Sequence, residues 1–209
     1  MVLTAHFIDK NWKLQKKIIN FCPIAGHSGE VIGRSIERCL LDWNIDKILT
    51  ITVDNASSND KCVDYLRERL NCWGGSILDG SCLHVRCAAH ILSLVVKEGL
   101  KDSSDHILRV RFAVRYVRSS PARMKKFKTC VEQEKIVSKK LLCLDVETRW
   151  NSTYLMLDAA LQLRKAFDLL KRDKKYHDEM EKLKGVPTDD DWDHIRVLLP
   201  FLESFYDTT

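Results

Sequence analysis

The spacing of hydrophobic residues predicts that the chain begins with a β-hairpin. Residues 2–8 are rich in β-branched and other apolar side chains, and a polar turn at 9–11 separates them from a second extended run over 12–22. Two extended runs joined by a short polar turn are typical of paired antiparallel strands. Pro23 and Gly26 then mark a loop.

The rest of the first part alternates helical and extended patterns. The elements expected here are a helix over 30–43, a strand buried on both faces over 48–53, a helix capped by residues 57–60, a short strand over 81–86 and a helix over 88–100. Such alternation predicts an α/β layered arrangement.

After residue 100 the hydrophobic spacing becomes almost entirely helical. The predicted elements are helices over 105–118, from Pro121 onward, over 151–171 and from about 188 onward, with one further strand at 141–146. We therefore expect two parts: 1–100 forms a partial α/β core, and 101–209 forms basic helices, one strand and the start of an all-helical domain.

Composition changes this picture little. The chain has 209 residues, 45% hydrophobic and 30% charged, which is ordinary for a globular protein. No apolar stretch is long enough to span a membrane and no secretory signal is evident, so we expect an intracellular protein without a membrane partner. The 8 cysteines are scattered singly through apolar runs, which favours reduced, buried thiols.

The net charge of +5 is modest, but its distribution is uneven. Residues 106–129 contain no acid and eight basic side chains: Arg109, Arg111, Arg115, Arg118, Arg123, Lys125, Lys126 and Lys128. Three of the arginines recur at helical spacing and are expected on one face. Such a block can follow a nucleic-acid backbone, and the alternative is an ordinary solvated helix face.

Asp54 is the carboxylate most suggestive of chemistry, because it directly follows the strand predicted at 48–53. Carboxylates at strand ends can hold the metal ions that catalyse phosphoryl transfer. The alternative is that Asp54 only organises the turn before the next helix, and position alone favours this second interpretation.

Four potential zinc ligands occur in the short segment 82–90. They are Cys82, His84, Cys87 and His90. Structural zinc sites usually join two ligand pairs across a spacer, and this segment has no second pair elsewhere, so packing is the favoured interpretation.

Arg149 and Trp150 stand between the strand predicted at 141–146 and the following helix. A tryptophan beside an arginine can stack on an unpaired base while the guanidinium holds a phosphate. A core tryptophan at a helix start explains the pair equally well.

Taken together, six segments resemble one family. They are LTAHFIDKNWKLQKKIINFCPI, ITVDNASSND, VRCAAHILSLVVKEGL, RYVRSSPARMKKF, LDVETRWNSTYLML and DDWDHIRVLLPFLESFYDTT. In this order they resemble the central region of hAT-superfamily transposases, especially plant zinc finger BED domain-containing proteins of the RICESLEEPER type.

The resemblance implies an incomplete RNase H-like core with a mostly α-helical insertion. Asp54 matches the second acid of the family's metal-binding triad, Cys87 and His90 match its CxxH motif, and Trp150 matches the tryptophan that handles a flipped base. Active members use Mg²⁺ or Mn²⁺, bind DNA, act in the nucleus and dimerise through a C-terminal region that we do not find in this chain.

The resemblance also suggests that this stretch is not a nuclease on its own. The first and last acids of the triad are expected outside it, and a lone carboxylate holds Mg²⁺ poorly. The expected function is therefore nucleic-acid binding by a catalytically inactive, transposase-derived protein, with no cofactor in this stretch. The alternatives are an internal part of an active metal-dependent DNA transposase and a helical protein-interaction module.

Overall fold

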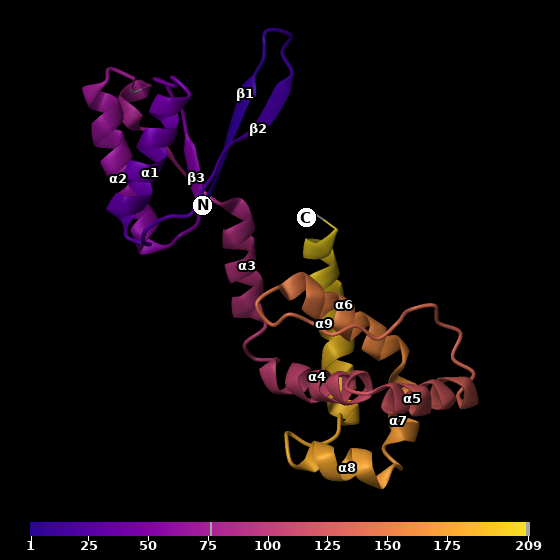
Figure 1. Cartoon of the computed structure of the whole chain (residues 1–209). Coiled ribbons are helices and arrows are strands. Elements are labelled where there is room, and N and C mark those ends of the chain that lie inside the picture. Colours follow the sequence, from indigo (N-terminus) through magenta and orange to yellow (C-terminus); the bar gives the residue numbers. More distant parts are fainter. Residues whose placement is uncertain (76, 208–209) are drawn as a thin grey trace. The chain divides into compact units, whose positions relative to one another are not determined.

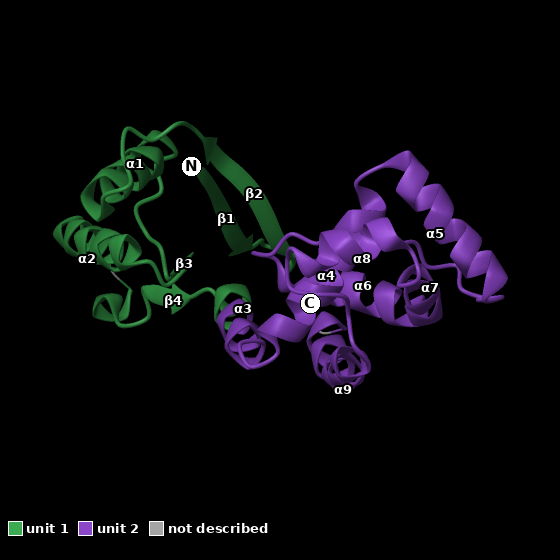
Figure 2. Cartoon of the chain, turned by 90° about the horizontal axis from the view of Figure 1, so that it is seen from below, with its two compact units in different colours: residues 1–91 green, residues 92–209 purple. Residues whose placement is uncertain are grey.

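The computed structural model describes residues 1–75 and 77–207 (Figure 1). The chain forms two compact units, coloured separately in Figure 2. Unit 1 is Met1–Ile91, and unit 2 begins at Leu92 and contains the rest of the described chain. The division falls earlier than the expected boundary at residue 100, because helix α3 (Ala88–Gly99) begins in unit 1 and ends in unit 2.

The predicted hairpin is confirmed. Strands β1 (Val2–Ile8) and β2 (Leu14–Phe21) pair antiparallel, from Val2 opposite Phe21 to Ile8 opposite Leu14. The Asp9 carboxylate organises the turn by accepting hydrogen bonds from the backbone N–H groups of Asn11 and Lys13, at 2.8 and 3.0 Å. This is the side-chain-to-backbone bonding that makes aspartate common in turns.

A second sheet of unit 1 contains two short parallel strands. These are β3 (Ile51–Val53) and β4 (His84–Arg86), with Val53 opposite Arg86. The strand predicted at 48–53 is thus shorter than expected and is not buried on both faces. Thr52 is exposed, and β4 is the single strand that pairs with β3 in the described chain.

Helices α1 (Gly29–Asp42) and α2 (Ser57–Cys72) pack together in unit 1, and a short 3₁₀ helix, η1 (Leu78–Gly80), precedes β4. Buried Ile36 and Leu40 of α1 contact buried Cys62 and Leu66 of α2. The approach is close at Gly33, where an added Cβ would lie 2.6 Å from Cδ1 of Tyr65. Only glycine allows this packing without a shift of the ring.

The cap predicted for α2 is wrong in detail. Residues 57–60 lie inside the helix, and the N-cap is Ala56, which has no side-chain capping group. The Asp54 carboxylate accepts a hydrogen bond from the backbone N–H of Ala56 instead.

Unit 2 is helical throughout its regular structure. Its helices are α4 (Ser104–Arg118), α5 (Pro121–Gln133), α6 (Trp150–Gln162), α7 (Arg164–Leu170), α8 (Lys174–Glu181) and α9 (Asp189–Tyr206), together with the end of α3. Their core is continuous and includes the fully buried side chains of Val114, Phe167, Tyr176, Trp192 and Ile195.

Two helix starts in unit 2 follow the sequence signals closely. The Ser120 side chain accepts from the backbone N–H of Arg123 at 3.2 Å, with Pro121 in the first turn of α5. Thr188 and Asp191 form a reciprocal capping box at the start of α9. Such caps satisfy helix N–H groups that have no partner within the helix.

Two predictions for unit 2 are wrong. The helix expected over 151–171 is two helices, α6 and α7, separated at Leu163, whose φ of −102° and ψ of 14° leave the helical region. Residues 141–146 form no strand. No backbone hydrogen-bond ladder joins these residues to another described segment. Their contacts with the rest of unit 2 are made by side chains, of which Leu142 and Asp145 are buried.

The architecture is thus mixed α/β, with small sheets followed by a largely helical region. Within residues 1–75 and 77–207, no helix combines the length and apolarity needed to cross a bilayer.

Candidate functional site

The parallel pairing of β3 and β4 brings two of the predicted site segments to one sheet edge. Parallel strands end at the same edge, and here the backbone N–H of Cys87 donates to the carbonyl of Val53 at 2.9 Å. Asp54 follows Val53 directly, so it leaves the sheet beside the start of α3. Asp54 and the Cys87–His90 segment, which the sequence analysis treated separately, therefore follow neighbouring strands at one edge.

The Asp54 side chain is committed to its own loop. Its Oδ1 accepts from the backbone N–H of Ala56 at 3.0 Å and from Nδ2 of Asn59 at 2.6 Å. In the described part of the chain, no cluster of three metal-ligating side chains includes Asp54. The residues present therefore do not fit the Mg²⁺ or Mn²⁺ site that the resemblance implies, since such ions require several oxygen ligands.

The four candidate zinc ligands do not converge either. Cys82, His84, Cys87 and His90 are absent from every group of three or more close ligand atoms among the described residues. The Cys87 carbonyl instead accepts from the backbone N–H groups of His90 and Ile91, both at 3.1 Å, which starts α3. The role of Cys87 that the structure shows is thus the backbone start of α3.

Most of the basic block on α4 and α5 is neutralised by acids from distant segments. The ion pairs are Arg109–Asp191, Arg111–Asp145, Arg115–Glu147, Arg123–Glu179 and Lys126–Asp173. The absence of acids within residues 106–129 therefore does not leave a uniformly positive surface, because the acids come from 145–191.

Arg111 is a structural residue. It is 8% exposed, and its guanidinium lies against the Asp145 carboxylate, with Nη2 at 2.7 Å and Nε at 2.9 Å from Oδ2. Thr153 Oγ1 donates to the same carboxylate at 3.0 Å. Buried charges are stable only when paired and hydrogen-bonded in this way, so Arg111 is not available to a ligand.

Arg123 and Lys126 are also engaged within unit 2. The Arg123 guanidinium carbon lies 4.0 Å from the centre of the Tyr116 ring, and its Nη2 is 2.5 Å from Glu179. Lys126 pairs with Asp173, the N-cap of α8, and this pairing lowers the pKa of the Asp173 carboxyl. These contacts fasten α5 to α8.

Of the basic block and Arg149, a smaller set of cations remains exposed and has no ion-pair partner among the described residues. These are Arg118, Lys125, Lys128 and Arg149. Arg118 ends α4, Lys125 and Lys128 belong to α5, and Arg149 is the N-cap of α6. We call these four residues the free cation set.

Trp150 lies in the core of unit 2. It is 7% exposed, and its ring meets that of Phe205 edge-on, with centroids 6.3 Å apart. A base cannot stack on a ring whose faces are covered by protein, so the structure supports the core interpretation of this residue.

Sequence reasoning missed the acids that organise unit 2. Asp191 is fully buried, and its carboxylate accepts from Arg109 Nε at 2.8 Å and from the Thr188 backbone N–H at 2.7 Å. Burial alone would raise its pKa, but the bonds from Arg109, Thr188 and His106 outweigh burial and hold the pKa at about 2. The sequence did place acids 189–191 at a helix start. It did not indicate that Asp191 binds Arg109 of α4, which is 82 residues away.

Comparison with known families separates the same two regions. Residues 1–82 match the family described as the ZBED1 RNase-like domain, and residues 85–201 match the ZBED1 RNase-like helical domain. The second match corresponds to most of unit 2 with α3, and the first corresponds to the hairpin, α1, β3 and α2.

Individual relatives match the whole chain. Zinc finger BED domain-containing protein RICESLEEPER 2 of Oryza sativa subsp. japonica is 36% identical over 99% of this chain. A Zea mays protein named "Putative AC transposase" is 35% identical over 100%, and Zinc finger BED domain-containing protein DAYSLEEPER of Arabidopsis thaliana is 31% identical over 98%. The chain spans 28%, 26% and 29% of the lengths of these three relatives, respectively.

Both family matches and these relatives agree with the order of elements in the structure, an α/β region followed by helices. The chain therefore belongs to the hAT transposase-related family of proteins with a ZBED1 RNase-like domain and its helical domain.

Proposed function

We propose that this chain is a nucleic-acid-binding part of a transposase-derived protein and that its contact with nucleic acid is made by unit 2. The observation that carries the proposal is the free cation set. Arg118, Lys125, Lys128 and Arg149 are exposed on α4, α5 and the start of α6 and have no acidic partner in the described chain.

The physical basis is the difference between paired and unpaired cations. A guanidinium already bound to a carboxylate gains little from a phosphate, whereas an exposed unpaired cation releases counterions from DNA when it binds. The family relationship supports DNA as the polyanion, because one relative is named a transposase. The proposal includes a nuclear location, where most DNA of a plant cell lies.

We also propose that this stretch binds DNA without cutting it. Support comes from Asp54, whose carboxylate is bonded to Ala56 and Asn59 and has no neighbouring pair of metal ligands in the described chain. The Mg²⁺- or Mn²⁺-dependent chemistry of active relatives is therefore not assigned to these residues.

The alternative, an internal part of an active metal-dependent transposase, is favoured by one observation. Asp54, which matches one acid of the family's triad, directly follows β3 at the end of a parallel strand pair, where carboxylates can hold catalytic metal ions. Incubating the chain with supercoiled plasmid and Mg²⁺ or Mn²⁺ tests whether this stretch cuts DNA by itself. Nicking that Asp54→Ala abolishes would support the enzyme and overturn the non-cutting proposal.

Binding is tested by fluorescence anisotropy with labelled duplex and hairpin DNA over a range of salt concentrations. We expect binding that weakens steadily with salt, because phosphate contact releases counterions. A folded sample that binds neither DNA at low salt would contradict the proposal and leave the helical unit as a protein-interaction module.

A further inference from the structure

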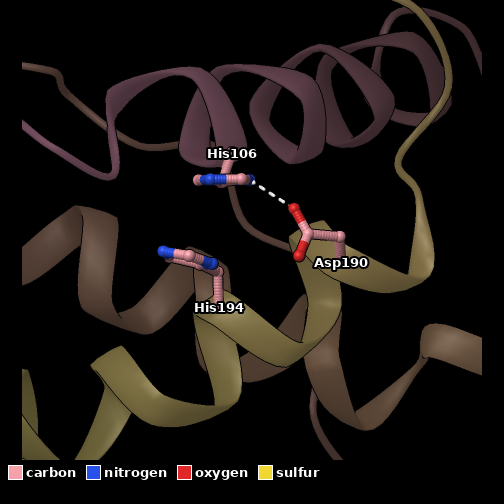
Figure 3. A group of neighbouring side chains, drawn as sticks. All are labelled: His106, Asp190 and His194. Atoms are coloured by element: carbon pink, nitrogen blue, oxygen red, sulfur yellow. Dashed lines mark ion pairs between the residues drawn. The ribbon is translucent and has the colours of Figure 1, made fainter.

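A cluster of three side chains in unit 2 shares no residue with the free cation set or with the β3–β4 edge. His106 comes from α4, and Asp190 and His194 come from α9 (Figure 3). One potential ligand atom from each residue lies within 4.8 Å of the others. Among the residues that the structure describes, this is the one such group of three.

We propose that His106, Asp190 and His194 form a binding site for a divalent transition metal of the Zn²⁺ class. The inference is independent of nucleic-acid binding, since none of these residues belongs to the free cation set.

The spacing on α9 suits a metal site. Asp190 and His194 are four residues apart in one helix, so their side chains project from the same face. Two ligands at this separation on a helix are the arrangement found in many helical zinc sites. His106 then supplies a ligand from a second helix, so a bound metal would join α4 to the first turns of α9.

The donor atoms select the class of metal. Two imidazoles and one carboxylate suit Zn²⁺, Co²⁺ or Ni²⁺, whereas Mg²⁺ and Ca²⁺ prefer sites made entirely of oxygen. Three protein ligands leave the fourth tetrahedral position for water.

The buried residues behind the cluster orient its histidine. His106 Nδ1 lies 2.7 Å from Oδ1 of Asp191, which Arg109 and Thr188 hold in place. Nδ1 of His106 therefore faces the first turn of α9, where it also lies 3.8 Å from Oδ2 of Asp190.

The neighbouring charges leave Asp190 available. Asp189 pairs with Arg164 and Asp191 pairs with Arg109, whereas the ion-pair partner of Asp190 in the described chain is His106, with Nδ1 and Oδ2 3.8 Å apart. The Asp190 carboxylate therefore lacks a permanently charged partner, which a metal ion would provide.

The present geometry is that of an open site. The His106 and His194 rings are stacked, with centroids 4.0 Å apart and planes at 14°, so their lone pairs do not point to one centre. His194 is the more exposed of the two histidines. Metal binding accordingly unstacks the rings, with the His194 ring making the larger movement.

The test is a titration of the untagged full chain with Co²⁺, followed by its visible absorption, and then displacement by Zn²⁺. We expect one equivalent to bind, without the intense sulfur-to-cobalt bands that thiolate ligands produce. His194→Ala and Asp190→Asn should each weaken binding at least about tenfold, since even residues behind a ligand contribute that much. Zn²⁺ should also raise the melting temperature of the wild-type chain, because the three ligands are brought together in the folded state.

His177→Ala is the matched control, because His177 is an exposed histidine of α8 in the same unit, and it should bind Co²⁺ as the wild type does. Both test residues are exposed, so their variants are expected to fold. Absence of stoichiometric binding, unchanged affinity in both test variants, or sulfur-to-cobalt bands that Cys87→Ser removes would each overturn the proposal.

Discussion

Asp191 joins the start of α9 to α4 through a single buried carboxylate. It accepts from Thr188 in the capping box, from Arg109, and lies 2.7 Å from His106 Nδ1. The folded state thus favours the ionised form, with a pKa of about 2 compared with an ordinary value of 3.8. A lowered pKa in the folded state means that ionisation stabilises folding.

The pH dependence of the free energy of unfolding should report the ionisation of Asp191 directly. Because the pKa is lowered on folding, the stabilisation is fully present above the unfolded value near 3.8 and is lost as the pH falls through about 2. Asp191→Asn should cost about 2 kcal/mol of unfolding free energy near neutral pH. Denaturant titrations of both proteins over the acid range should show the difference shrinking, and a difference that does not vary with pH would contradict the assignment.

Trp150 offers a second test at single-residue scale. Trp150→Ala should lower the free energy of unfolding by about 3–5 kcal/mol, because it removes a large side chain from a packed core. Trp12→Ala is the control, since Trp12 is 87% exposed at the hairpin turn, and it should change stability by less than about 0.5 kcal/mol. Equal effects of the two substitutions on thermal unfolding would show that Trp150 is not a core residue.

At the scale of elements, the segment 141–147 is held to neighbouring helices by its side chains, although a strand was expected at 141–146. Asp145 binds Arg111 of α4 and Thr153 of α6, and Glu147 binds Arg115 of α4 at 2.6 Å. The segment is therefore fixed to α4 by two ion pairs and to α6 by a hydrogen bond, without a sheet.

Replacing Asp145 or Glu147 should lower the free energy of unfolding by very different amounts. Asp145→Ala leaves Arg111 buried without a partner and should destabilise unit 2 by about 3–5 kcal/mol. Glu147→Ala breaks an exposed pair and should cost less than about 1 kcal/mol. Denaturant unfolding measures both, and an Asp145 effect as small as that of Glu147 would mean that the buried pair does not hold the segment.

Elements with local signals were predictable from the sequence. The hairpin, the start of α5 at Ser120 and Pro121, and the capping box of α9 all depend on residues a few positions apart. The break at Leu163 contains no glycine or proline, and 141–146 has a β-type composition but is held by the buried Arg111–Asp145 ion pair instead of a sheet. The break at Leu163 and the missing strand at 141–146 depend on packing between distant segments. The spacing of hydrophobic residues along the chain does not show such packing.

The candidate site, too, was only partly predictable from the sequence. The basic character of α4 and α5 was evident, but the partner of Arg111 lies 34 residues away and that of Arg109 lies 82 residues away. The sequence therefore indicated which residues are positive, whereas only the structure separates the paired cations from Arg118, Lys125, Lys128 and Arg149.

At the scale of the whole molecule, the two units differ in how completely their apolar surface is covered. Unit 2 has one continuous core, whereas the hairpin of unit 1 exposes Trp12, Leu14 and Phe21 at 87%, 72% and 83%. A two-stranded hairpin is marginally stable by itself, and open strand edges favour association. A function that depends on a rigid surface is therefore better supported by unit 2.

The central claim is that the free cation set makes the nucleic-acid contact, and charge-matched variants test it most directly. One variant replaces Arg118, Lys125, Lys128 and Arg149 by glutamine. Its control replaces four other exposed cations of unit 2 that have no ion pair in the described chain, namely Arg172, Lys174, Lys175 and Lys182. Both variants carry the same net charge.

The measurement is the slope of log binding constant against log salt concentration for duplex DNA, from anisotropy. If each cation of the set meets one phosphate, the test variant should lose about 3–4 units of slope, while the control keeps the wild-type slope. An equal loss in both variants would show that binding depends on overall charge alone. An unchanged slope in the test variant would show that nucleic acid is bound elsewhere or not at all.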